Sequence, residues 1–184
     1  MNWVGIGFGC IKAARRALHE MSVVKALNNE INIQTTADVV SHKAIIKYLE
    51  RKKISCVVHS EEASKQIVLH QGTKEVIFVI DPLDNSHLYL RGEISFCSVA
   101  IMILLKGKPC YAFVGSLSTP DIYHCDERQS YKNKQKLEIP RTAPGRALIL
   151  GWAPYRLRFE RLYQSLVGLT EKDCYVYNFG GQLQ

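Results

Sequence analysis

Apolar side chains recur at close to helical spacing in two stretches near the start of the chain. In residues 9–29 these side chains are Ile11, Leu18, Met21, Val24 and Leu27, and in residues 35–53 they are Val39, Ala44, Ile45, Tyr48 and Leu49. Thr35, with Asp38 three residues later, resembles a capping box, and the helix dipole favours an acid in the first turn. We predict one helix in each stretch, the second beginning near residue 35.

The stretch "GIGFG" (5–9) precedes the first predicted helix. It has neither the G-x-G-x-x-G spacing nor the preceding strand of a dinucleotide-binding loop. We therefore interpret it as a flexible N-terminus.

Short apolar runs further along the chain predict strands. These runs are residues 54–58, 76–80, 95–105, 110–117 and 121–125. The segment "KGKP" (106–109) predicts a turn that joins two of these strands, and prolines with a glycine in residues 138–146 predict a domain boundary. Beyond the boundary we expect a strand at 147–151, a helix at 155–169 and a strand at 174–181. The pattern therefore predicts a mixed α/β chain with one domain at 1–140 and an incomplete second domain at 141–184.

Composition indicates an ordinary globular protein, because 47% of the 184 residues are hydrophobic and 22% are charged. The six cysteines show no C-x-x-C spacing, and several lie in apolar surroundings, which favours buried thiols in a reducing cytoplasm. No apolar run approaches the roughly 18 residues that a membrane span requires. The N-terminus also lacks the pattern of a signal peptide. We expect a cytoplasmic protein without a membrane partner.

The net charge of +7 favours anionic partners, which include phosphorylated small molecules as well as nucleic acids. The basic clusters at 51–53, 132–136 and 156–161 are separate, however, and they interleave with polar residues. No nucleic-acid-binding motif accompanies them. We therefore expect a phosphorylated small molecule as the partner, and no nucleic acid.

The segment "VIDPLDNSHLYLRGE" (79–93) places Asp81 and Asp84 at the end of an apolar run. One interpretation is a polar turn that ends the strand. The other is a metal site, because magnesium binds carboxylate and carbonyl oxygens, and two such ions can clamp the oxygens of a phosphate ester. In that case the Leu83 carbonyl can face a cation, and a helix beginning near Ser86 can point N–H groups at a phosphate. The residues alone leave both interpretations open.

Three motifs resemble those of the magnesium-dependent, lithium-sensitive phosphatase superfamily, and they occur in the same order. "DPLDNS" (81–86) resembles its D-P-[IL]-D-[GS]-[ST] signature, "TTADVVSHKAI" (35–45) its T-x-x-D helix start, and "SEEAS" (60–64) its G-E-E-S. The first acids of the three motifs are separated by 23 and 20 residues, as in inositol monophosphatases. The similarity continues through residues 95–125 and extends weakly to "YNFGG" (177–181). This superfamily includes inositol monophosphatases, fructose-1,6-bisphosphatases and 3′-nucleotide bisphosphate phosphatases.

The resemblance implies an inositol-monophosphatase-like fold, an α+β sandwich of alternating helix and sheet layers. It also implies two or three magnesium ions as cofactors, with lithium as an inhibitor. Glu61 is then a ligand of the first ion, Asp81 bridges two ions, and the Leu83 carbonyl completes the first site. Asp84 binds the second ion.

The resemblance also implies how the substrate and the attacking water are held. The Ser86 hydroxyl, with Asp38 behind it, orients and activates the water, and Glu61 helps to hold it. Backbone amides at Asn85 and Ser86 hold the phosphate. The implied catalytic residues are Asp38, Glu61 and Ser86, and the implied substrate contacts are Asp84, Asn85, Ser86 and Gly181.

The chain departs from the family pattern at several places. Asn85 and Ser86 stand where most relatives have Gly-Thr. Asparagine tolerates a positive φ, but its side chain crowds a backbone that must approach phosphate. Ser60 replaces the glycine before the acidic pair, and Tyr177 stands near the place of an arginine. The family motif W-D-x-A-x-G, whose aspartate completes the second metal site, is expected beyond residue 184, so we expect the chain to be the N-terminal part of a longer relative.

The resemblance therefore implies magnesium-dependent hydrolysis of a small phosphomonoester, an inositol monophosphate or a sugar phosphate, by a homodimer. The alternative is a catalytically impaired relative that serves as a phosphate-binding or dimerisation module, for which Asn85 and the missing aspartate argue. The sequence does not distinguish an inositol phosphate from fructose 1,6-bisphosphate or a nucleotide bisphosphate.

Overall fold

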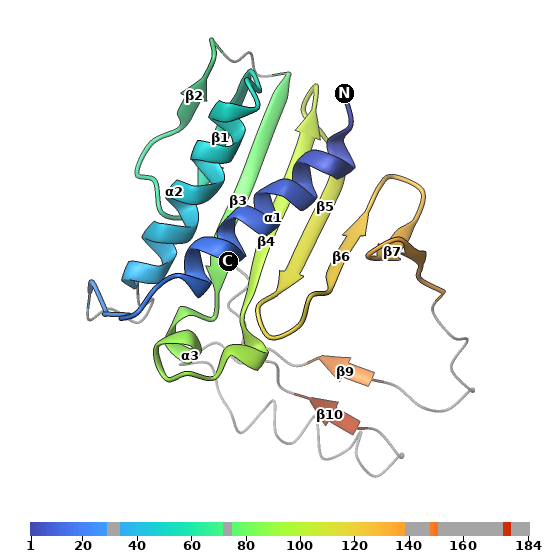
Figure 1. The fold of residues 1–184 in the computed structure, drawn as a ribbon. Helices are drawn as coiled ribbons and strands as arrows, with labels where there is room; N and C mark the ends of the chain where they lie inside the picture. Colours follow the sequence, from blue (N-terminus) through green and yellow to red (C-terminus); the bar gives the residue numbers. More distant parts are fainter. Residues whose placement is uncertain (29–33, 72–74, 139–147, 151–174, 178–184) are drawn as a thin grey trace, which may run out of the picture. The chain divides into compact units, whose positions relative to one another are not determined.

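The computed structural model describes residues 1–28, 34–71, 75–138, 148–150 and 175–177 (Figure 1). The chain divides into two compact units, Met1–Leu137 and Glu138–Gln184. These units resemble the predicted domains 1–140 and 141–184, but whether each is an independent domain stays a prediction. The predicted helix at 155–169 and Gly181 lie outside the described residues.

Within the described part of the first unit, eight strands form one sheet, in the order β2-β1-β3-β4-β5-β6-β7-β8. Strand β1 runs parallel to β3, and every other neighbouring pair is antiparallel. The strands are β1 (Cys56–Ser60), β2 (Ile67–Leu69), β3 (Val76–Asp84), β4 (Ser98–Leu105), β5 (Lys108–Ser116), β6 (Ile122–Cys125), β7 (Ser130–Lys132) and β8 (Gln135–Lys136). The pattern had not indicated β2, β7 and β8, which are only two or three residues long.

Two long helices, α1 (Trp3–His19) and α2 (Thr36–Arg51), lie across one face of this sheet (Figure 1). A short helix α3 (Ser86–Leu90) and a 3₁₀ turn η1 (Ile94–Phe96) connect β3 to β4. In the second unit, β9 (Leu148–Leu150) and β10 (Tyr175–Tyr177) form a parallel pair, inside the predicted strand segments 147–151 and 174–181. Among the described residues, no helix combines the length and apolar character that crossing a membrane requires.

The prediction for the first helix was wrong at both ends. Residues 5–9 are helical rather than flexible, because α1 already begins at Trp3. Asn2 is its N-cap, and the Asn2 side chain accepts a 2.9 Å hydrogen bond from the Gly5 amide. Glycine is a poor helix former, but two of these glycines permit close packing. A Cβ at Gly7 would collide with the Phe113 ring, and one at Gly9 would collide with the Tyr48 hydroxyl.

The first helix also ends at His19, although apolar side chains continue at helical spacing to Leu27. Ala26 instead forms an antiparallel bridge with Thr35, and the Leu27 amide donates to the Gln34 carbonyl at 2.8 Å. This pairing gives hydrogen-bond partners to the described residues at both ends of the connection to α2. Leu27 itself is 51% exposed, so its place in the apolar pattern does not reflect burial.

The prediction for the second helix is confirmed. Helix α2 begins after Thr35, and the capping box that pairs Thr35 with Asp38 is present. The predicted β4–β5 hairpin is also confirmed. Its turn residues, Lys106 and Gly107, both have positive φ, 51° and 78°, as expected of the two-residue turns that match the twist of a hairpin.

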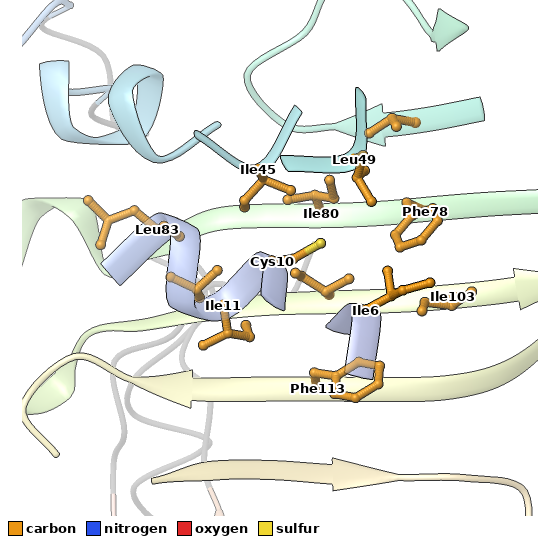
Figure 2. Close-up of a cluster of buried hydrophobic side chains, with 14 of the residues drawn as sticks. Ile6, Cys10, Ile11, Ile45, Leu49, Phe78, Ile80, Leu83, Ile103 and Phe113 are labelled. Carbon is orange, nitrogen blue, oxygen red and sulfur yellow. The ribbon is translucent and has the colours of Figure 1, made fainter. Parts of the chain in front are cut away.

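The core fills the space between the two helices and the sheet (Figure 2). Strand residues on the helix side alternate with residues on the other face, as the two-residue period of a strand requires. The labelled side chains are Ile6, Cys10 and Ile11 from α1, Ile45 and Leu49 from α2, and Phe78, Ile80, Leu83, Ile103 and Phe113 from the sheet. The five cysteines within the described residues are free thiols, as predicted. Three are buried, whereas Cys110 and Cys125 are only partly so.

Candidate active site

Strand β3 continues beyond the predicted run 76–80 and carries Asp81 and Asp84 itself. Its pairing with β4 changes register between these two residues, where three steps along β3 oppose two along β4. Such a bulge suits Pro82, which has no amide proton to donate to the ladder. The Leu83 amide donates to the Asp81 Oδ1 atom at 3.2 Å, and the Leu83 side chain is buried in the core. The bulged "DPLD" segment is therefore held firmly as the last part of β3.

Asn85 adopts the left-handed backbone conformation, with φ 64° and ψ 43°, and it is the N-cap of α3. This is a conformation that asparagine tolerates better than most residues with a side chain. Its side-chain amide donates to the Phe96 carbonyl at 2.9 Å and to the Asp84 Oδ2 atom at 3.1 Å. Asn85 thus has a backbone conformation that glycine adopts readily, and its side chain also links Asp84 to the η1 segment.

Asp38 and Ser86, far apart in sequence, are hydrogen-bonded to each other. The Ser86 hydroxyl donates to Asp38 Oδ1, while Asp38 Oδ2 accepts from the Thr35 amide and hydroxyl at 2.6 Å each. The Leu83 carbonyl also lies 2.8 Å from the Ser86 oxygen. Because a hydroxyl has one proton, Ser86 donates to only one of these two acceptors at a time. Asp38 therefore closes the capping box and contacts Ser86 simultaneously.

The second acidic segment follows β1, which lies parallel to β3 with Ser60 opposite Ile80. The Glu61 amide donates to the Ile80 carbonyl at 3.3 Å, one residue before Asp81. The carboxyl ends of parallel neighbours lie at the same edge of a sheet. The sequence segments around residues 61 and 81 therefore meet there, although 20 residues separate them.

The acids of the site influence one another electrostatically. Burial raises the pKa of Asp81 to about 7, and the nearby charges of Glu61 and Asp84 act in the same direction. Burial also raises the pKa of Asp84, against the effect of a hydrogen bond from Ser98. For Asp38, burial raises the pKa while the bonds from Ser86 and Thr35 oppose the rise. These shifts indicate several carboxylates in one poorly solvated place.

The donor set has the chemistry of a magnesium site. Carboxylate and carbonyl oxygens are the ligands that hard divalent cations prefer, and a cation relieves the repulsion among buried carboxylates. Within the part of the chain that the structure describes, however, no three His, Cys, Asp or Glu side chains are grouped so as to hold a metal ion as they stand. The acids share one edge of the sheet, but the expected convergence at metal-bridging distance is not seen. The ligand set Glu61, Asp81, Leu83 and Asp84 therefore stays a prediction.

Two residues of α2 contact the site segments and had not been singled out from the sequence. The Ser41 hydroxyl donates to the Pro82 carbonyl at 2.7 Å, and His42 Nδ1 lies 2.8 Å from the Ser60 hydroxyl. The available signal was their helical spacing from Asp38, since residues i, i+3 and i+4 share one face of a helix. Gly181, the remaining predicted substrate contact, lies outside the described residues.

Comparison with known proteins gives related sequences that match part of the chain. Nus factor SuhB of Xylella fastidiosa is 30% identical over an alignment of 112 residues that covers 56% of this chain and 38% of that protein. A fructose-1,6-bisphosphatase/inositol-1-monophosphatase of Archaeoglobus fulgidus is 31% identical over an alignment of 106 residues that covers 56% of this chain and 39% of that protein. The matched part therefore spans about two fifths of the length of these relatives.

Solved structures show the same fold. The extragenic suppressor protein SuhB of Bartonella henselae has a TM-score of 0.78 at 16% identity, covering 98% of this chain and 71% of that one. An IMPase of Thermotoga maritima has a TM-score of 0.73 at 11% identity, covering 98% and 69%. These likenesses confirm the predicted inositol-monophosphatase-like fold. The sequence model of one family, the inositol monophosphatases, matches residues 4–155, and this chain belongs to that family.

Proposed function

We propose that this protein hydrolyses a small phosphomonoester, an inositol monophosphate or a sugar phosphate, in a magnesium-dependent reaction. Membership of a phosphatase family supports hydrolysis of this class. The observation that carries the proposal is the hydrogen bond from Ser86 to Asp38, next to the turn with Asp81 and Asp84. It joins a hydroxyl and a buried carboxylate beside a set of acids suited to divalent cations.

We assign the metal ligands to Glu61, Asp81, the Leu83 carbonyl and Asp84. When bound, magnesium ions acidify a water molecule and neutralise the charge of phosphate oxygens. Burial, with the repulsion from Glu61 and Asp84, raises the pKa of Asp81, and a cation among these acids would relieve the unfavourable charge.

Ser86 and Asp38 orient the attacking water in this proposal. With its own proton directed to Asp38, the Ser86 oxygen can accept a hydrogen bond from the water. As the water loses its proton to Ser86, Ser86 passes its proton to Asp38. The two bonds from Thr35 hold the Asp38 carboxylate in place, and its burial makes it a stronger base. The backbone amides of Asn85 and Ser86 are the proposed donors to the phosphate.

We also propose that the protein acts in the cytoplasm as a homodimer on phosphorylated small molecules, and that lithium inhibits it. The family resemblance supports each of these points. It supports fructose 1,6-bisphosphate and nucleotide bisphosphates as further substrates to test.

A second candidate function is that of a phosphate-binding or dimerisation module with impaired catalysis. Two observations favour it. The Asn85 side-chain amide donates to Asp84 Oδ2, where it would compete with a cation. Within the described residues, the acids are also not grouped so as to hold a metal ion. One relative is named Nus factor SuhB, a name that does not describe a phosphatase.

Hydrolysis assays distinguish the two candidates. The purified protein is tested on inositol monophosphate, fructose 1,6-bisphosphate and a nucleotide bisphosphate, with magnesium or with a chelator. We expect hydrolysis that the chelator abolishes and that Ser86→Ala lowers about 100-fold or more. Ser118→Ala, at the exposed Ser116–Ser118 hydroxyl pair, is the matched control and should keep full activity. Phosphate binding without hydrolysis at any magnesium concentration would favour the second candidate.

A further inference from the structure

One face of helix α2 contacts all three segments that carry the site acids and hydroxyl. Asp38, Ser41 and His42 follow one another at helical spacing, so their side chains project from the same face. Asp38 accepts a hydrogen bond from Ser86, and Ser41 donates one to the Pro82 carbonyl. His42 Nδ1 is hydrogen-bonded to the Ser60 hydroxyl. The helix is thus a common support for residues 60, 82 and 86. The Asp38 contact reaches α3, and the Ser41 contact reaches the end of β3. The His42 contact reaches the residue before Glu61.

Ser60 is the last residue of β1, and the turn that follows begins from it. Its carbonyl accepts from the Ala63 amide at 3.1 Å, and its hydroxyl oxygen accepts from the Glu62 amide at 3.4 Å. Glu61 lies between these bonds, and its own amide is held by the Ile80 carbonyl. A change in the position of Ser60 is therefore transmitted to the backbone that carries the Glu61 carboxylate.

The hydrogen bonds of Ser60 also allow its hydroxyl to donate to His42. A hydroxyl has one proton and two lone pairs, so accepting from the Glu62 amide leaves its proton available to His42 Nδ1. In that arrangement His42 accepts at Nδ1 and is neutral, with its proton on Nε2. Burial, with a smaller effect of Lys43, lowers the pKa of His42, which agrees with a neutral ring.

We propose that His42 is a positioning residue that holds Ser60 and thereby fixes the Glu61 turn against helix α2. The imidazole links this turn to the same rigid element that holds Pro82 and Ser86. Its effect on magnesium affinity rests on the proposed function, whereas the bracing of the turn does not. Partners that orient metal ligands typically change metal affinity 10–100-fold when they are removed.

Four variants test the contact: His42→Ala, Ser60→Ala, the double variant, and His42→Asn. The asparagine oxygen can stand in for Nδ1 as an acceptor for the Ser60 hydroxyl. His19→Ala is the matched control, because His19 is an exposed histidine in the last turn of α1. Two measurements are made on each protein: amide hydrogen exchange of residues 61–63 without metal, and calorimetric titration with magnesium.

We expect His42→Ala and Ser60→Ala each to speed exchange at residues 61–63 about tenfold and to weaken magnesium binding about 10–100-fold. The double variant should be no worse than either single variant, because both remove the same contact. His42→Asn should recover most of the protection, and His19→Ala should behave as the unaltered protein. Equal losses in His42→Asn and His42→Ala, or additive losses in the double variant, would overturn the proposal.

The two measurements separate this inference from the proposed function. If exchange responds as expected but the unaltered protein binds no magnesium, then His42 braces the turn and the metal-dependent function is wrong. If the protein binds magnesium tightly and exchange at residues 61–63 is the same in all variants, then the positioning role is wrong and the proposed function stands.

Discussion

Helices α1 and α2 cover the same face of the sheet but contribute to the molecule differently (Figure 1). The buried residues of α1 are apolar or glycine, namely Ile6, Gly7, Cys10, Ile11, Ala14 and Leu18. Helix α2 buries Ala37, Ile45 and Leu49 together with Asp38 and Ser41. Buried polar groups are costly unless they are hydrogen-bonded, and both polar side chains of α2 have partners in the site segments.

This difference indicates a division of roles between the helices. Helix α1 stabilises the unit by apolar packing, and substitutions on it should mainly affect the free energy of unfolding. The polar face of α2 holds the site segments, and substitutions on it should mainly affect the activity. Four experiments can break or sharpen this comparison.

The largest effect is expected at the site itself. If the proposed function is right, Asp81→Asn should lower magnesium-dependent hydrolysis at least about 100-fold, because bound metal contributes several kcal/mol to the transition state. The fold should persist, since the substitution removes a charge that burial and neighbouring acids disfavour. Initial rates and thermal unfolding are measured together. Asp126→Asn, in an exposed turn, is the control, and comparable activity in both variants would exclude the assigned role of Asp81.

The next experiment compares the loss of apolar packing by α1 with the loss of a polar contact made by α2. Ile11→Ala should lower the free energy of unfolding by about 2–5 kcal/mol, because the side chain is fully buried between α1 and the sheet. Ser41→Ala should cost only about 1–2 kcal/mol, the effect of one lost hydrogen bond to a buried carbonyl. Urea titrations give both values. The activity should fall more in Ser41→Ala than in Ile11→Ala when both are assayed well below their unfolding midpoints, and the opposite order would contradict the division of roles.

A smaller effect is the dependence of stability on pH without metal. The pKa of Asp81 is raised to about 7 in the folded chain from an ordinary value of 3.8. The group therefore contributes stability that is complete below its unfolded pKa and is lost as the pH rises through about 7. The metal-free protein should be more stable near about pH 5.5 than near about pH 8, by on the order of 1–2 kcal/mol. Chemical denaturation at both pH values measures this, and Asp81→Asn should flatten the dependence. A steeper loss in that variant would show that other groups dominate.

The smallest effect separates two glycines of α1. Alanine favours a helix by about 1 kcal/mol over glycine, but overpacking a core costs about 1–3 kcal/mol. At Gly7 the obstacle is the buried Phe113 ring, so Gly7→Ala should be destabilising by about 1 kcal/mol net. At Gly9 the obstacle is the hydroxyl end of the partly exposed Tyr48, which can move, so Gly9→Ala should be nearly neutral. Thermal unfolding of the two variants compares them directly, and equal stability would show that Phe113 yields as readily as Tyr48.

The sequence by itself determined the elements that depend on neighbouring residues. The start of α2 was predictable because the capping box closes within four residues, and the β4–β5 turn because Gly107 and Pro109 mark a turn between two apolar runs. The order and spacing of the acids at residues 38, 61, 81 and 84 also indicated the family. The first two signals are local, and the third is a sequence pattern shared with the family. None of them depends on which elements pack together in the fold.

Only the tertiary structure decided the features that depend on residues distant in sequence. The start of α1 at Trp3 overrides the low helix propensity of its glycines, because Gly7 packs on Phe113 of a strand more than 100 residues away. The contacts of Ser41 with Pro82 and of His42 with Ser60 likewise join α2 to strand ends that follow it by 41 and 18 residues. A hydroxyl or an imidazole on a helix can find many partners, and only the position of the helix on the sheet selects one of them.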